Sequence, residues 1–271
     1  MNHHMTNPLK QGSTIGILGG GQLGRMLAIA ASKLGFKTHI YEPGKNPPAS
    51  QVANKVTTAA YEDTNALIMF ANEVDVITFE FENIPETALN TLETTREVLP
   101  ARNALATSQD RITEKKFLEK LGLKVAPYAN INTQTDLLSA LATVGAPSIM
   151  KTRRFGYDGK GQVRLKEVDD GYTAWEELGK TPCVLEGLID FKKEVSVIGA
   201  RNQSGEVVCF DPGENIHKNG ILHTTNVPAD ITSSQRMDAV LLTGKILNAL
   251  DYVGVMGIEL FVTAEELLIN E

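Results

Sequence analysis

The sequence of 271 residues predicts an α/β part with a doubly wound parallel sheet, followed by an α+β part with antiparallel strand pairs. Three observations support this fold class. An apolar run at 14–18, a helical pattern at 22–34 and a strand at 38–41 form a βαβ unit. A polar stretch that begins at Pro100 indicates a boundary. After a helix predicted at 110–121, strands with long separations replace the regular alternation of strands and helices.

The remaining elements follow from local patterns. In the first part, a helical segment at 65–72 precedes a strand at 74–79. The second part has apolar or alternating segments that predict strands at 148–152, 163–166, 183–186, 194–200 and 207–211. An amphipathic helix at 233–250 then precedes two last strands, at 253–262 and 267–271.

Composition limits the classes of function. Hydrophobic residues make up 42% and charged residues 22%, which is ordinary for a soluble globular protein. A net charge of -7 argues against nucleic acid as a partner, because that would need an extended basic surface. Cys183 and Cys209 are far apart, so neither a zinc site nor a disulfide framework is indicated. Without an apolar run of about 18 residues or an apolar signal segment, we expect a cytoplasmic protein with no membrane partner.

The segment 149–162 carries the clearest chemical signal. An apolar strand delivers Lys151 and then passes into a loop that is rich in glycine and positive charge. Glycines let a backbone turn sharply and expose its N–H groups, and cations attract phosphate, so the segment predicts a polyphosphate site. The alternative is a basic hairpin tip, which needs only one turn glycine. The loop residues concerned are Arg153, Arg154, Gly156, Gly159, Lys160 and Gly161.

A second glycine loop lies near the N-terminus. Gly19, Gly21 and Gly24 match G-x-G-x-x-G between a strand and a helix, and Glu42 follows the second strand, where an acid that binds ribose would lie. A nicotinamide or flavin oxidoreductase is therefore one interpretation. A single substrate phosphate at the helix N-terminus satisfies the same backbone. The second phosphate site and the carboxylate pair described next favour the single phosphate.

Two acids lie in the last two predicted strands. Glu259 and Glu271 have apolar neighbours, and a buried carboxylate is costly unless it is paired or bound to a metal. With an odd number of residues in the turn, the two acids would face each other and suit Mg²⁺, whereas an even turn would place them on opposite faces. Asn270 offers one more oxygen ligand. The alternative is that both acids lie on a solvated face.

These motifs together resemble the ATP-grasp superfamily, and within it the enzymes that carboxylate a ribonucleotide in purine biosynthesis. The likeness runs from about Ser13 to the last residue, and 20–26, 156–162 and 269–271 are its most specific segments. It implies ATP- and Mg²⁺-dependent carboxylation of 5-aminoimidazole ribonucleotide with bicarbonate through carboxyphosphate, by a homodimer. A related transformylase that uses formate and glycinamide ribonucleotide has an acid at the position of Gln22 and lacks the Tyr157–Asp158 pair.

The resemblance also implies a domain division. It places a Rossmann-like domain that binds the substrate phosphate at 1–108, and an ATP-grasp domain at 109–271 with a lid at about 122–186. Members of the family continue beyond the Asn270–Glu271 pair, so the portion 187–271 is expected to be incomplete and the chain to be truncated at its C-terminus. A fragment that binds ATP without turnover therefore remains an alternative.

The resemblance assigns roles to individual residues. Asp158 and Lys151 are expected to be catalytic, and Glu259 and Glu271 to hold Mg²⁺. The substrate contacts are expected at Gly21, Gln22, Leu23, Tyr157 and Asp158. The residues expected to contact ATP are Arg111, Lys151, Gly156, Tyr157, Asp158, Gly159, Lys160, Gly161, Gln162, Glu186, Gly187, Leu188, Ile189, Glu194, His217, Asn270 and Glu271.

Overall fold

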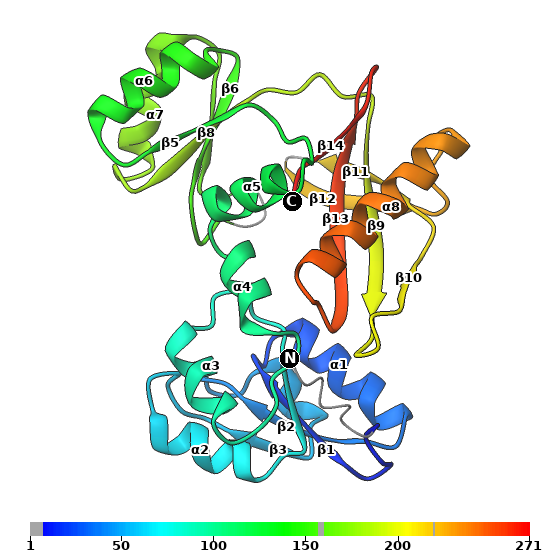
Figure 1. The fold of residues 1–271 in the computed structure, drawn as a ribbon. Coiled ribbons are helices and arrows are strands. Elements are labelled where there is room, and N and C mark those ends of the chain that lie inside the picture. The colour runs from blue at the N-terminus through cyan, green and yellow to red at the C-terminus, as the bar shows by residue number, and fades with distance from the viewer. Residues whose placement is uncertain (1–7, 157–159, 219) are drawn as a thin grey trace. The chain divides into compact units, whose positions relative to one another are not determined.

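The computed structural model describes residues 8–156, 160–218 and 220–271, and it divides the chain into two compact units (Figure 1). The first unit is Met1–Ala106 and the second is Thr107–Glu271. Each unit has its own sheets and helices. Among the described residues, no helix has the length and apolar character needed to cross a membrane.

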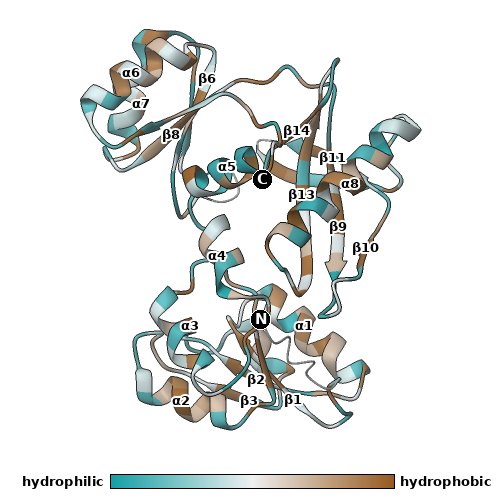
Figure 2. Cartoon of the chain, viewed as in Figure 1, coloured by the Kyte–Doolittle hydropathy of each residue, from teal (hydrophilic) through white to brown (hydrophobic). Residues whose placement is uncertain are grey.

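The first unit is built on the predicted parallel sheet. Its four strands lie in the order β3-β2-β1-β4, and every pairing is parallel. Because β1 has a neighbour on both sides, it is largely hydrophobic and its last three residues are buried (Figure 2). The strands are β1 (Thr14–Leu18), β2 (Lys37–Tyr41), β3 (Lys55–Thr57) and β4 (Val76–Phe79). The helices are α1 (Gln22–Lys33), η1 (Pro48–Gln51), α2 (Thr64–Asn72) and α3 (Glu86–Glu93), and α4 (Arg102–Ser108) spans the boundary between the units in the sequence.

Helix α2 packs closely on this sheet. Asp63 caps it by accepting a hydrogen bond from the amide of Ala66, and Phe70 is buried in the core. A Cβ atom on Gly16 would lie 2.8 Å from the Phe70 ring, so glycine in β1 is what lets the helix approach. The close packing fixes the end of β1, from which the N-terminal glycine loop emerges.

The second unit contains a small antiparallel sheet in the order β5-β8-β6-β7. Helices α6 and α7 pack on it through a core that includes Leu141, Met150, Trp175 and Leu185. The indole N–H of Trp175 donates to the carbonyl of Thr181 at 3.1 Å. The strands are β5 (Tyr128–Ile131), β6 (Ser148–Thr152), β7 (Gln162–Leu165) and β8 (Cys183–Gly187), and the helices are α5 (Arg111–Lys120), α6 (Gln134–Val144), η2 (Val168–Asp170) and α7 (Gly171–Glu177).

A larger sheet completes the second unit. Its main path is β12-β11-β9-β13-β14, and β10 pairs with β9. Helix α8 (Ser233–Ala249) begins with a capping box between Thr232 and Gln235 and packs on β9, where Thr243 and Leu247 fill the space above Gly199. The strands are β9 (Lys193–Arg201), β10 (Val207–Cys209), β11 (Gly213–Lys218), β12 (Ile221–Asn226), β13 (Gly254–Val262) and β14 (Leu267–Ile269).

The predicted fold class is confirmed, but several elements were not predicted. Strand β12 is exposed along its whole length, so it lacks the alternation that identifies a strand. Helix α7 has only seven residues, too few for a clear helical period. Strand β14 ends at Ile269 and not at Glu271. The other elements that the sequence patterns missed are η1, β3, α3, α4, β5, α6, η2 and β11.

The helical glycines Gly171 and Gly244 differ in the space around them, so we expect their replacement by alanine to change the stability of the protein in opposite directions. A Cβ on Gly171 would lie 2.6 Å from Leu141 Cδ1 in the core, whereas the nearest atom to one on Gly244 is 3.9 Å away. We expect Gly171→Ala to destabilise the protein by about 1–3 kcal/mol through overpacking. The matched control Gly244→Ala should stabilise it by about 0.5–1 kcal/mol. Urea unfolding followed by circular dichroism measures both, and equal changes would contradict the packing argument.

Candidate active site

A buried carboxylate between two lysines lies at the centre of the candidate site. Glu186 on β8 is 5% exposed. Its Oε2 lies 2.8 Å from the ammonium of Lys151 on β6, and its Oε1 lies 3.1 Å from that of Lys115 on α5. Burial opposes ionisation of Glu186, yet the two lysines hold its pKa below the usual value. The predicted phosphate lysine is therefore fixed by an ion pair on a rigid strand.

Arg153, which the sequence placed among the cations of the phosphate loop, has a structural role. Its guanidinium contacts both carboxylate oxygens of Asp110, the closest pair being Nη2 and Oδ2 at 2.6 Å. The same carboxylate caps α5 by accepting from the amides of Ile112 and Thr113. This interaction anchors the first turn of α5, which carries Arg111. The charge of Arg153 is therefore neutralised within the fold.

The glycine-rich loop follows β6 directly. The amide of Thr152 donates to the carbonyl of Gly161 at 2.8 Å, and Gly161 has a φ of +68°, which favours glycine. Gln162 begins β7 directly opposite Lys151, while Gly156 and Lys160 flank the loop. The predictions for Tyr157, Asp158 and Gly159 lie outside the described residues.

A group of acids lies on the larger sheet of the same unit. Glu194 on β9 has a buried Oε1 that no described residue hydrogen-bonds, and His217 Nδ1 lies 3.4 Å from that oxygen. Burial is the largest cause that raises the pKa of Glu194; Glu259 raises it further, and Lys151 opposes the rise. The predicted residues Lys151, Glu194, His217 and Glu259 thus interact electrostatically although they come from four strands.

The turn between β13 and β14 has four residues, so the alternation of side chains predicts Glu259 and Glu271 on opposite faces. The pairing changes at the end of the chain. The Asn270 amide donates to the Glu259 carbonyl, and the Glu259 amide donates to the Glu271 carbonyl, both at 2.8 Å. Asn270 and Glu271 therefore both lie opposite Glu259, as in a β-bulge. Glu271 pairs with Arg111 at 3.4 Å and still raises the pKa of Glu259, after the larger effect of burial.

These acids have the chemistry of a Mg²⁺ site. Burial raises the pKa of Glu259, and the charge of Glu271 raises it further, so a hard cation bound to both carboxylates would relieve their repulsion. Among the described residues, no group of three or more His, Cys, Asp or Glu side chains forms a ready metal site. Mg²⁺ commonly uses one or two carboxylates and completes its shell with waters and phosphate oxygens. The pair Glu259 and Glu271 fits that mode of binding.

The hinge after β8 uses most of its amides within the fold. Gly187 N donates to the Pro127 carbonyl at 2.8 Å, and Leu188 N donates to the Pro147 carbonyl at 3.1 Å. None of the residues that the structure describes accepts a hydrogen bond from Ile189 N. Of the three predicted hinge residues that follow Glu186, Ile189 is therefore the one whose amide remains available to a base.

The N-terminal glycine loop binds two carboxylates of its own unit. Gly20 N donates to Glu42 at 2.8 Å, and Gly21 N donates to Glu80 at 2.9 Å. A Cβ on Gly19 would lie 2.8 Å from the Glu80 carboxylate. The glycines therefore make room for Glu80, which is a structural reason for the motif that the sequence alone does not reveal. The amides of Gln22 and Leu23 lie in the first turn of α1, where no intrahelical acceptor exists.

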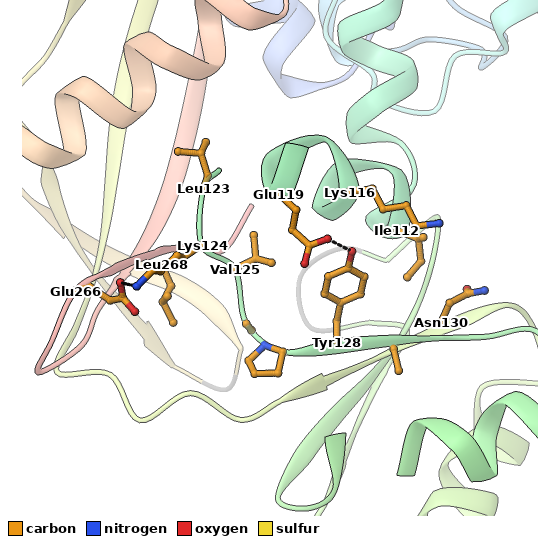
Figure 3. Close-up of a pocket in the computed structure, with 13 residues that line it drawn as sticks. Ile112, Lys116, Glu119, Leu123, Lys124, Val125, Tyr128, Asn130, Glu266 and Leu268 are labelled. Carbon is orange, nitrogen blue, oxygen red and sulfur yellow. Dashed lines mark hydrogen bonds and ion pairs between the residues drawn. The ribbon is translucent and has the colours of Figure 1, made fainter. Parts of the chain in front are cut away.

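A separate pocket of about 830 Å³ lies beside α5 (Figure 3). Tyr128 donates to Glu119 at 2.7 Å on its wall, and Lys116 lies nearby on the same helix. None of the predicted site residues lines it. The lining residues are Ile112, Lys116, Glu119, Leu123, Lys124, Val125, Ala126, Pro127, Tyr128, Ala129, Asn130, Glu266 and Leu268.

Comparison with known proteins assigns a class to this arrangement. The model of the ATP-grasp domain matches residues 116–271, and the model of the ribonucleotide synthetase preATP-grasp domain matches residues 12–109. The second unit thus has an ATP-grasp fold, as the resemblance implied. The interpretation of the N-terminal loop as a dinucleotide site receives no support from these matches.

The chain belongs to the N5-carboxyaminoimidazole ribonucleotide synthase family. It is 51% identical to the protein of that name from Brucella melitensis over 97% of this chain and 74% of the relative. It also resembles the Staphylococcus aureus synthetase solved with ADP, with 38% identity, a TM-score of 0.93 and coverage of 98% of this chain and 71% of that one. The synthase from Aspergillus clavatus, solved with ADP and 5-aminoimidazole ribonucleotide, has 27% identity, a TM-score of 0.87 and coverage of 96% and 69%.

Two residues at the site were missed by the sequence patterns. Lys115 is 2% exposed and contacts Glu186, and Glu114 is half-buried near Arg111 and Glu271. A signal for Lys115 existed, because it lies between Ile112 and Leu118 on the buried stripe of α5. A lysine on such a stripe is seldom buried without a partner.

The burial of Glu114 predicts a pH dependence of stability. Burial, and then the charge of Glu271, raises its pKa from 4.5 to about 8. The folded protein therefore holds this proton more tightly than the unfolded chain, and stability is lost as the pH rises from about 4.5 to about 8. The glutamine in Glu114→Gln cannot ionise, so this variant should not lose that stability. The free energy of unfolding of Glu114→Gln minus that of the wild type should therefore increase by at least about 1 kcal/mol from pH 5 to pH 8.

Urea titrations at both pH values measure this gain. The exposed Glu177→Gln, at the end of α7 in the same unit, is the matched control and should show no such dependence on pH. If the difference in free energy of unfolding between Glu114→Gln and the wild type stays constant from pH 5 to pH 8, Glu114 does not have the raised pKa.

Proposed function

We propose that this protein carboxylates 5-aminoimidazole ribonucleotide with bicarbonate, consuming ATP in the presence of Mg²⁺ and releasing N5-carboxyaminoimidazole ribonucleotide, ADP and phosphate. The observation that carries the proposal is that Lys151 lowers, and burial raises, the pKa of both Glu194 and Glu259, so that a lysine and two buried acids from three strands of an ATP-grasp fold act on one site. The relatives solved with ADP, and with ADP and 5-aminoimidazole ribonucleotide, support the same chemistry.

Each part of ATP finds a suitable group in the second unit. Lys151 and Arg111 provide partly buried positive charge for the phosphates. The amide of Ile189 offers a hydrogen bond to the adenine, because the amides of the two preceding residues are already engaged. Glu194 and His217 suit the ribose hydroxyls, because the carboxylate has an oxygen without a hydrogen bond.

Glu259 and Glu271 are the residues that would hold Mg²⁺, with Asn270 beside them. When bound, the ion neutralises charge on the phosphates during transfer. The pair also interacts with Arg111, since Glu271 lies 3.4 Å from its guanidinium. One carboxylate is thereby shared between the metal site and the phosphate site.

The reaction needs a protected intermediate. An oxygen of bicarbonate attacks the γ-phosphorus, the bond to the bridging oxygen of ADP breaks, and carboxyphosphate forms. This anhydride reacts readily with water, so a lid must cover it. We assign that role to the loop at 156–162, and we keep Asp158 as the residue proposed to orient or deprotonate the substrate amine, with Tyr157 beside it.

The first unit is proposed to hold the ribonucleotide phosphate. The hydrogen bond from Gly21 to Glu80 leaves Gln22 and Leu23 as the amides in the first turn of α1 that are best suited to an anion. We further propose that the enzyme is cytoplasmic and a homodimer, and light scattering on the purified protein tests the dimer.

A coupled assay tests the reaction. We expect ADP release that requires bicarbonate and 5-aminoimidazole ribonucleotide together, because the transfer of phosphate and the carboxylation share one intermediate. Release with formate and glycinamide ribonucleotide would instead identify the transformylase. ATP, but not NADH, should raise the melting temperature, and the reverse result would support an oxidoreductase.

Replacement of a proposed metal ligand should raise the need for Mg²⁺. Glu259→Gln removes a charge from the pair, so the Mg²⁺ concentration for half-maximal activity should rise at least about tenfold. The control is Glu265→Gln in the exposed turn of the same hairpin, which should leave that concentration unchanged. Equal Mg²⁺ dependence in all three proteins would exclude Glu259 as a ligand.

A further inference from the structure

Lys115 is a buried lysine that contacts Glu186, the acid at the centre of the candidate site. It is 2% exposed, and its ammonium lies 3.1 Å from Glu186 Oε1 and 5.7 Å from the centre of the Tyr128 ring. Tyr128 and Glu186 are direct cross-strand neighbours on β5 and β8. The ammonium on α5 therefore contacts two adjacent side chains of the small sheet.

Each oxygen of the Glu186 carboxylate forms an ion pair with a different lysine. Lys115 faces Oε1 and Lys151 faces Oε2. The three side chains together carry one net positive charge. Lys151 has a side chain that is 15% exposed, against 3% for Lys115 and 7% for Glu186. The excess charge is thus accessible to an anion only at Lys151.

We propose that Lys115 is a positioning residue for ATP, which neutralises Glu186 and so leaves the charge of Lys151 available to a phosphate. Without Lys115, Glu186 and Lys151 form a closed pair with no net charge. The ammonium of Lys151 is then drawn to the carboxylate, and the site loses its attraction for a polyphosphate. The inference rests on the proposed function, because it assigns ATP to Lys151.

The fold holds Lys115 in place for this task. The hydroxyl of Tyr128 donates to Glu119 at 2.7 Å (Figure 3). Glu119 and Lys115 both belong to α5. The ring that lies beneath the ammonium is therefore fixed by the same helix. A cation near an aromatic face is also stabilised by the ring.

The test compares the affinity for MgATP by isothermal titration calorimetry, together with KM for ATP and kcat. Lys115→Met should raise both the Kd and the KM for ATP at least about tenfold, because Glu186 then neutralises Lys151. Lys115→Arg keeps the charge and should recover most of the affinity. The double variant Lys115→Met with Glu186→Gln removes the carboxylate as well, so it should bind ATP more tightly than Lys115→Met alone.

Controls separate this role from a purely structural one. Lys116→Met changes the neighbouring exposed lysine of α5 and should bind ATP like the wild type. If Lys115→Met only lowers the melting temperature and binds ATP normally at 25 °C, the proposal is wrong. It is also wrong if the double variant binds no better than Lys115→Met. A wild-type protein that binds no ATP would instead refute the proposed function.

Discussion

The carboxylate of Glu186 is the constraint on which the candidate site depends. It is buried on the central part of a small sheet, and it stays ionised because lysines from two other elements reach it. The same contact fixes Lys151 on β6 and attaches α5 to the sheet. Because α5 also carries Arg111, one buried anion determines where two cations of the proposed phosphate site lie. A buried carboxylate costs free energy, and here it gives the site a defined geometry in return.

Charge is distributed along the proposed site in a definite order. Lysines and Arg111 lie beside the small sheet, whereas Glu194 and Glu259 lie on the large sheet. The acids have raised pKa values because they are buried and lie close to one another. Such an arrangement is unfavourable without ligands, and a polyphosphate with its cation supplies both missing charges.

The sequence predicted the elements with a strong local period and the residues that lie on them. The βαβ unit and the place of Lys151 on a strand follow from spacing. Spacing alone would put Glu259 and Glu271 on opposite faces, and only the hydrogen bonds at the end of the chain set both Asn270 and Glu271 opposite Glu259. Three-dimensional partners could not be predicted, because they depend on contacts between distant residues. Arg153 looks like a phosphate cation until Asp110 is seen beside it. The need for glycine in the N-terminal loop likewise becomes clear only from the structure, in which Glu80 packs against these residues.

The position of the single tryptophan has a practical consequence. Trp175 is the only one in the sequence, and it is buried in the core beneath the small sheet. Its indole nitrogen bonds to a carbonyl of the same subdomain. Tryptophan emission, excited selectively so that the six tyrosines do not contribute, therefore reports on this subdomain alone. Any movement that repacks the small sheet when a nucleotide binds can be followed optically, without a label, separately from changes in the large sheet or in the first unit.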